Sequence, residues 1–157
     1  GGRCSLLAAL AFGAAGCGGT PPFPTVPSAT VVRALIAQGS GSNVAATDPT
    51  DDDRRLAPPV LPMPLTQAAA HLTATVKRLS RWKILGTSDS VIWATRSTRL
   101  FRFTDDIVIL LVPLGDSTRV EARSSSRLGK GDLGQNRRNL AELWGAALIR
   151  PAGPSTS

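Results

Sequence analysis

The continuous apolar run from Ile107 to Val112 constrains the fold more than any other feature of this sequence. A half-exposed antiparallel strand alternates apolar and polar residues, whereas a strand covered on both faces is apolar throughout. The run therefore predicts a central strand with protein on both sides. Pro113-Leu114-Gly115-Asp116 follows it and predicts a tight turn into the next strand.

Three further segments have the character of strands. Trp82–Leu85 and Val91–Thr95 are rich in β-branched or aromatic residues, and Arg99–Phe103 is predicted to prolong the second of them. Thr104-Asp105-Asp106 contains turn-forming residues and is predicted to reverse the chain. After the central strand, small or apolar residues alternate with charged ones. Val120, Ala122 and Ser124 are predicted to face inward, and Arg119, Glu121 and Arg123 are predicted to face outward.

Helical periodicity flanks the four predicted strands. Apolar residues recur at spacings of three and four from Leu65 to Leu79, and Thr66 is predicted to cap a helix that ends near Ser80. A second helix is predicted from Asp132 onward. This order, with connections of hairpin length, predicts an α+β fold: an antiparallel four-stranded meander packed against two helices in a two-layer sandwich.

Proline, glycine and small polar residues dominate the sequence before this domain. Most of the 12 prolines lie between residues 20 and 64, which predicts a long irregular N-terminal arm. Within it, the apolar run Thr30–Ile36 is compatible with either a helical turn or an edge strand. We therefore divide the chain into an apolar segment (1–19), a Pro/Gly-rich extended arm (20–64), an α+β domain (65–150) and a flexible tail (151–157).

The apolar residues from Cys4 to Gly18 have the character of a targeting signal. They are too few to cross a bilayer as a helix, which takes about 20 residues. Arg3 precedes them, and Ala14-Ala15-Gly16-Cys17 resembles a lipoprotein cleavage box. Two interpretations stay open, a targeting remnant and a buried or membrane-lying helix. Both cysteines of the chain lie here, so no thiol is available within the domain.

Positive charge is concentrated on the predicted domain. The first 65 residues carry four arginines and four aspartates, so the whole net charge of +7 falls on the remainder. Such a charge favours anionic partners, which are nucleic acid, anionic lipid or an acidic protein face, and a solvated basic face without a partner is the alternative interpretation. Nucleic acid is disfavoured, because three Trp, four Phe and no Tyr leave few rings for stacking on bases. The candidate partner contacts are Arg99, Arg102, Arg119, Arg123, Arg127, Arg137, Arg138 and Phe23.

No segment has the pattern of a catalytic, cofactor or metal site. Residues 129–134 match G-x-G-x-x-G, but no second βα unit follows and Asp132 would repel a pyrophosphate, so a glycine-rich turn with a helix cap is predicted. Asp105-Asp106 and Asp51-Asp52-Asp53 fit no metal-ligand spacing. The single histidine, His71, lacks a partner, and Ser124-Ser125-Ser126 lacks a nucleophile elbow. We predict no enzyme activity, no cofactor and no metal.

Three stretches, Thr98–Ile109, Ser117–Gly129 and Asp132–Asn136, resemble domain-of-unknown-function family 1499. Residues 41–47 and 56–58 are similar to that family's N-terminal motif, so the resemblance covers about residues 40–148. Relatives commonly have cysteines near this motif, where the present chain has Asn43-Val44. Any disulfide or thiol role of relatives is therefore absent here.

The resemblance implies an exported bacterial or plastid protein with a non-enzymatic role. We expect an accessory, scaffolding or assembly subunit of a membrane-associated, photosynthetic complex at the chloroplast thylakoid, either lumenal or membrane-associated. The alternative location is the bacterial periplasm or a membrane anchor. The expected partners are protein subunits, bound through the arm and the basic face, and anionic lipid.

A small-molecule or lipid carrier is the alternative function. Its pocket would lie between sheet and helices, near Trp82, Trp93 and Trp144. An enzyme would need a cluster of polar groups in that pocket, which the sequence does not predict.

Overall fold

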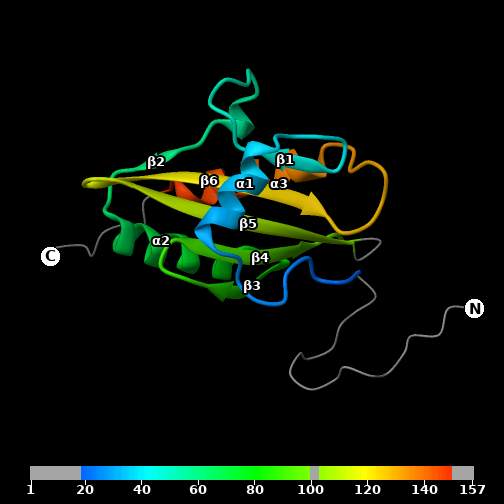
Figure 1. Cartoon of the computed structure of the whole chain (residues 1–157), viewed down its shortest axis with the longest axis horizontal. Helices are drawn as coiled ribbons and strands as arrows, with labels where there is room; N and C mark the ends of the chain where they lie inside the picture. The colour runs from blue at the N-terminus through cyan, green and yellow to red at the C-terminus, as the bar shows by residue number, and fades with distance from the viewer. Residues whose placement is uncertain (1–18, 100–102, 150–157) are drawn as a thin grey trace, which may run out of the picture.

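The computed structural model describes residues 19–99 and 103–149 (Figure 1). The fold is α+β, as predicted, with three helices and a six-stranded antiparallel sheet. The predicted tail, Arg102 and all of the apolar segment except Gly19 lie outside the described residues.

The sheet is a meander completed by strands from earlier in the chain. Its four long strands pair in chain order and are β3 (Trp82–Thr87), β4 (Val91–Ser97), β5 (Thr104–Leu114) and β6 (Ser117–Ser126). Two short strands, β1 (Val44–Ala46) and β2 (Val60–Leu61), both pair with β6 on its other side. The predicted four-stranded meander is present, and the segment expected to be an irregular arm extends it to six strands.

Helices cover both faces of the sheet (Figure 1). The helices α2 (Leu65–Arg78) and α3 (Gln135–Ala147) pack on one face, and α1 (Ala29–Ala37) packs on the other. A short 3₁₀ turn, η1 (Arg54–Leu56), precedes β2. The predicted two-layer sandwich is therefore corrected to three layers. None of the described helices combines the length and apolar character that a bilayer crossing requires.

Strand β5 is buried on both faces, which confirms the prediction of a central strand. Ile107, Ile109 and Leu111 point into the larger core, under α2 and α3. Val108 and Leu110 point into a smaller core, under α1. Burial of an aliphatic side chain of this size contributes about 1.5–3 kcal/mol to the free energy of folding, so leaving either face uncovered would cost several such contributions.

The apolar run that was compatible with a helix or an edge strand forms α1. Ser28 caps it, since its Oγ accepts a hydrogen bond from the Val31 amide at 3.3 Å. Val32 and Ile36, four residues apart, lie on the face of α1 that contacts the sheet and are buried. The neighbouring prolines do not prevent this helix because they lie outside it.

The reversal between β4 and β5 lies earlier than predicted. The Thr98 amide donates to the Phe103 carbonyl, and the Phe103 amide donates to Thr98 Oγ1, both at 2.9 Å. Strand β4 ends at Ser97, and Arg99 and Phe103 lie outside both strands, whereas residues 100–102 of the predicted extension lie outside the described residues. Asp105 and Asp106, predicted to form the turn, are instead buried inside β5. Partners distant in the sequence override their local turn preference, as described below.

The helix ends also differ from the prediction by a few residues. Helix α2 begins at Leu65 with Pro64 at the N-cap, so Thr66 is not the cap, and it ends at Arg78. Helix α3 begins three residues after Asp132, behind Gly134. A proline can start a helix because its missing amide donor would have no intrahelical partner there.

The chain before α1 seals the smaller core. The ring of Phe23 packs edge-on against Trp93, with centroids 5.4 Å apart and an interplanar angle of 85°. Val26 lies against Gly86 of β3 so closely that a Cβ atom at Gly86 would come within 2.3 Å of Val26 Cγ2. Gly86 is therefore required by the close approach of this segment.

We expect Gly86→Ala to lower the free energy of unfolding by about 1–3 kcal/mol, because the added methyl group overpacks this contact. In a Val26→Ala background the clashing methyl group is gone, so the same substitution should cost clearly less. Chemical denaturation of the four variants measures the coupling. An equal cost in both backgrounds would contradict the packing of this segment on the sheet.

Candidate functional site

A buried ion pair joins Asp106 of β5 to Arg127, just after β6. Arg127 donates from Nε to Asp106 Oδ2 at 2.7 Å and from Nη2 to Oδ1 at 3.0 Å. Trp93 Nε1 also donates to Oδ1, at 3.0 Å. The side chains of Asp106 and Arg127 are only 3% and 11% exposed. The two-pronged contact and the indole N–H together compensate the burial of this charge.

The preceding residue, Asp105, points to the opposite face of the sheet, toward α3. Ser126 Oγ and Asn139 Nδ2 each donate to one of its carboxylate oxygens, both at 2.8 Å. Asn139 Nδ2 also donates to Ser124 Oγ at 3.0 Å, and Ser124 Oγ donates to Asn136 Oδ1 at 2.6 Å. This polar network links β5, β6 and α3 at the point where their apolar contacts end.

The members of this network are hydrogen-bonded to one another. Ser124 Oγ donates to an amide oxygen and has no basic partner among the described residues. The single histidine, His71, lies elsewhere, with Nε2 2.6 Å from the carbonyl oxygen of Ala147. Within the described ranges, no group of three or more His, Cys, Asp and Glu side chains could hold a metal ion.

Asp132 fixes the base of the loop between β6 and α3. Its Oδ1 accepts from the Gly134 amide at 2.9 Å, and its Oδ2 accepts from the Asn136 amide at 2.8 Å. Burial raises the pKa of Asp132, but these hydrogen bonds outweigh that effect and hold the pKa below its ordinary value. The predicted glycine-rich turn is present, with Gly134 in the left-handed conformation (φ 80°) as the N-cap.

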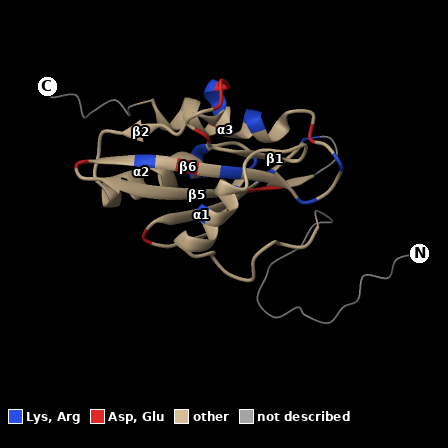
Figure 2. Ribbon diagram, turned by 45° about the horizontal axis from the view of Figure 1, so that its top comes forward, with Lys and Arg blue, Asp and Glu red and all other residues tan. Residues whose placement is uncertain are grey.

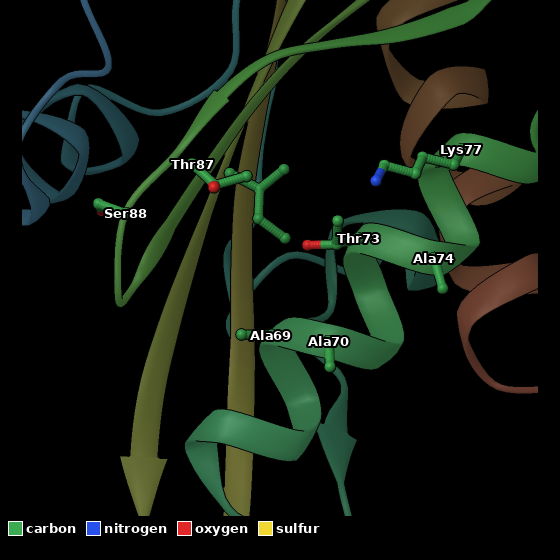
Figure 3. A pocket seen from close by; sticks show the side chains of 8 residues that line it. Ala69, Ala70, Thr73, Ala74, Lys77, Thr87 and Ser88 are labelled. Atoms are coloured by element: carbon green, nitrogen blue, oxygen red, sulfur yellow. The ribbon is translucent and has the colours of Figure 1, made fainter.

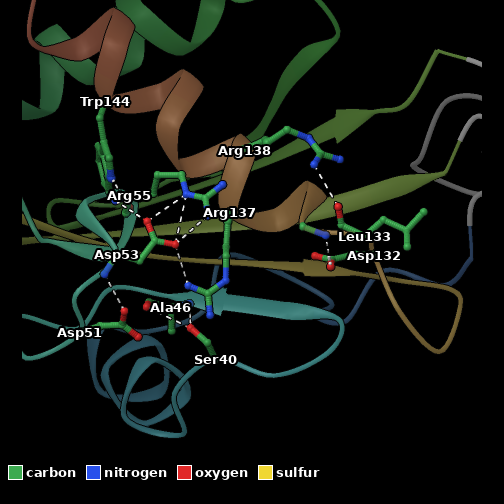
Figure 4. A network of polar contacts seen from close by, with 11 residues as sticks. Ser40, Ala46, Asp51, Asp53, Arg55, Asp132, Leu133, Arg137, Arg138 and Trp144 are labelled. Atoms are coloured by element: carbon green, nitrogen blue, oxygen red, sulfur yellow. Dashed lines mark hydrogen bonds and ion pairs between the residues drawn. The ribbon is translucent and has the colours of Figure 1, made fainter.

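This loop displays Leu133 to solvent. Leu133 has a φ of +51°, a conformation that is strained for a leucine, and it is 94% exposed. Its carbonyl oxygen accepts a hydrogen bond from Arg138 Nη1 at 2.9 Å (Figure 4). Earlier in the loop, Leu128 is 48% exposed. A strained backbone that presents an apolar side chain to water costs stability, which makes it a candidate for function.

Exposed cations lie at the same end of the sheet as these leucines. Arg99, Lys130 and Arg138 are exposed, and none of them forms an ion pair with an acidic residue in the part of the chain that the structure describes. The β4–β5 turn, the loop after β6 and the first described residues lie at one end of the sheet (Figure 1). We call the surface formed by Arg99, Leu128, Lys130, Leu133 and Arg138 the loop surface.

The predicted arginine contacts do not gather on one face (Figure 2). Arg119 and Arg123 of β6 point to the α1 side of the sheet, and Arg127, just after β6, continues the same alternation. Helix α3 carries Arg137 and Arg138 on the other side.

Several of these arginines have partners within the protein. Arg127 binds Asp106, Arg119 binds Glu121 at 3.5 Å, and Arg137 Nη1 binds Asp53 at 2.9 Å, which ties α3 to η1 (Figure 4).

Arg123 and Phe23 are also largely engaged by the fold. Burial lowers the pKa of Arg123, against the opposing charge of Asp106, and its buried Nε has no hydrogen-bond partner among the described residues. The ring of Phe23 packs on the smaller core. Arg99 and Arg138 are the two predicted contacts that belong to the loop surface.

The three tryptophans do not surround a common pocket. Trp82 and Trp144 belong to the larger core, and Trp93 belongs to the smaller one. An open cavity of about 400 Å³ lies between α2 and the β3–β4 turn (Figure 3). It is lined by Ala69, Ala70, Thr73, Ala74, Lys77, Thr87, Ser88 and Ile92.

The polar network and Leu133 were missed from the sequence, although a signal for the network was present. Ser124 was predicted to face inward, which already placed a polar side chain in the core. Asn136 and Asn139 stand at helical spacing from Leu140 and Leu143, so they continue the apolar stripe of α3 with amides. An inward serine and two inward amides together indicate a buried polar network.

We expect Arg127→Met to lower the free energy of unfolding by about 3–5 kcal/mol, because it leaves Asp106 buried without its counter-charge. Adding Asp106→Asn should recover part of this loss, since the amide oxygen still accepts from Trp93. Arg119→Met is the matched control in a more exposed pair and should cost no more than about 1 kcal/mol. Equal losses for Arg127→Met and Arg119→Met in urea denaturation would contradict this account.

Asp132→Asn should lower stability at neutral pH by about 1 kcal/mol, because the helix loses a charged cap. The folded pKa of Asp132 lies below its ordinary value of 3.8. Its contribution is therefore complete above the unfolded pKa and disappears as the pH falls through the folded pKa. Denaturation curves of the two proteins should converge on acidification, and a constant difference down to the lowest pH would overturn the assignment.

Comparison with known proteins identifies the family. Among solved structures, the chain is similar to the crystal structure of TTHA0849 from Thermus thermophilus, with 13% identity, a TM-score of 0.31, and coverage of 58% of this chain and 91% of that chain. A search of curated proteins found no match. The profile of the family described as "Protein of unknown function (DUF1499)" matches residues 23–146. This match spans most of the chain, from the segment that seals the smaller core to the last helix, and the protein therefore belongs to the DUF1499 family.

Proposed function

We propose that this protein is a non-catalytic accessory or assembly subunit of a larger membrane-associated complex. We place that complex in the photosynthetic membranes of a plastid, with the bacterial periplasm or membrane as the alternative location. The occurrence of relatives in bacteria and plastids supports this assignment, as does the apolar sequence from Cys4 to Gly18.

The use of the buried polar side chains carries the proposal. Asp105, Asp106 and Ser124 have partners inside the protein, and the resulting network holds the β6–α3 loop. That loop presents Leu133 to solvent in a strained conformation. An exposed apolar side chain that buried polar groups hold in a strained backbone conformation supports a role in binding.

The proposed protein contacts lie on the folded domain and not on an extended arm. Phe23 and Val26, which belong to the segment expected to reach a partner, pack against the smaller core. The outer side of α1 exposes Val31, at 44%, and Arg33. An apolar residue next to a cation on an exposed helix face fits the buried centre and polar rim of a protein interface.

Native purification tests the subunit proposal. The full-length tagged protein should be recovered from mildly solubilised membranes together with stoichiometric partner subunits, identified by mass spectrometry. Val31→Glu combined with Arg33→Glu should lower that recovery about tenfold, the effect of about 1.4 kcal/mol at an interface. Wild-type protein that is recovered as a monomer without partners would contradict the proposal.

A small-ligand carrier is the second candidate, favoured by the open cavity beside α2. Thr73 points from α2 toward the strands (Figure 3), so Thr73→Phe should fill this cavity, while the subunit proposal expects unchanged recovery of partners. Native mass spectrometry that detects a bound small molecule or lipid in the wild type, and its loss in Thr73→Phe, would support the carrier instead.

A further inference from the structure

We propose that the loop surface docks on a lipid bilayer, with Leu133 and Leu128 inserted among the headgroups and the cations of the same surface bound to anionic lipid. This inference rests on the membrane association in the proposed function. It adds which end of the molecule faces the lipid and which residues make the contact.

The first argument is the presentation of the leucines. Leu133 is 94% exposed and is held at a φ of +51° by hydrogen bonds on both sides of it. The Asp132 amide donates to the Ser42 carbonyl at 3.0 Å, which ties the loop to the residues before β1. A rigid loop needs little ordering when it inserts, so most of the gain from removing leucine from water is retained.

The second argument is the distribution of charge between the two ends of the sheet. The loop surface carries three exposed cations, and the carboxylate of Asp132 in the same loop offsets one of them, so this end keeps a net positive charge. The opposite end, where the β3–β4 and β5–β6 turns lie, carries exposed Asp89 and Asp116 (Figure 2). A molecule with net positive charge at one end and negative charge at the other is oriented by the negative potential of an anionic membrane, with its positive end toward the lipid.

The third argument is the point at which the apolar N-terminal sequence joins the domain. The Gly19 carbonyl oxygen accepts a hydrogen bond from Arg127 Nη1 at 3.3 Å, and an added Cβ at Gly19 would lie 3.5 Å from Leu128 Cγ. The residues from Cys4 to Gly18 contain no charged side chain. Any association of that sequence with a bilayer therefore brings the loop surface toward the same bilayer.

Site-specific labelling tests the orientation in the full-length chain. Cys4→Ser and Cys17→Ser remove the native thiols, and either Leu133→Cys or the control Leu114→Cys then accepts an environment-sensitive dye. Leu114 is a suitable control because it is 46% exposed and is the last residue of β5, next to the β5–β6 turn at the opposite end of the sheet. On vesicles of phosphatidylcholine with phosphatidylglycerol, the dye at position 133 should shift to shorter wavelength and be quenched by brominated lipid. The dye at position 114 should do neither.

Binding measurements separate the apolar from the charged part of the contact. Leu133→Asn should weaken vesicle binding about tenfold while stability stays equal or rises, because asparagine tolerates the left-handed conformation. Arg99→Gln and Lys130→Gln should each weaken binding about fivefold on vesicles with phosphatidylglycerol and leave binding to pure phosphatidylcholine unchanged. Leu114→Asn should change neither.

Two results would overturn the inference. If the bound protein shows the same dye response at positions 133 and 114, the loop surface does not face the lipid. If Leu133→Asn abolishes recovery of partner subunits but not vesicle binding, the loop surface is a protein contact, and the proposed subunit function stands without this inference. If the wild-type protein neither binds vesicles nor is recovered with partner subunits, both this inference and the proposed subunit function are wrong.

Discussion

The need to cover both faces of strand β5 organises the whole molecule. Its five buried aliphatic side chains point alternately into two cores, so the strand requires a layer on each side. Helices α2 and α3 supply one layer, and α1 with the segment before it supplies the other. The segment from Phe23 to the end of α1 is therefore part of the folding unit, because Val108 and Leu110 would face water without it.

The same strand begins with two charged residues before its apolar run, and these residues link the fold to the surface that we consider functional. Asp105 and Asp106 lie where the two helical layers end, and each finds hydrogen-bond donors on its own face of the sheet. Their partners include Arg127 and Asn139, one on each side of the β6–α3 loop. The network consequently fixes both ends of that loop, and the loop can hold Leu133 outward in a conformation that leucine does not choose by itself.

The two ends of the sheet are unlike, and the difference gives the molecule a direction. One end combines exposed leucines, exposed cations and the point where the apolar N-terminal sequence is attached. The other end has tight hairpins with exposed aspartates. Because the protein contacts proposed for α1 lie on a face and the lipid contacts lie at an end, a bilayer and a partner subunit can be bound at the same time.

The sequence alone determined the α+β class, the central strand and the alternation of β6, because these follow from local periodicity. The tertiary structure decided everything that depends on pairs of residues far apart in the chain. Thr30–Ile36 became a helix because a second core needed a cover, although the run by itself was compatible with a strand. Asp105-Asp106 became buried strand, although aspartates locally favour turns, because Arg127 and Asn139 neutralise or bind them across the fold. The loop surface could not be predicted from the sequence either. Leu133 has the composition of a core residue, and only its left-handed backbone conformation places it in solvent.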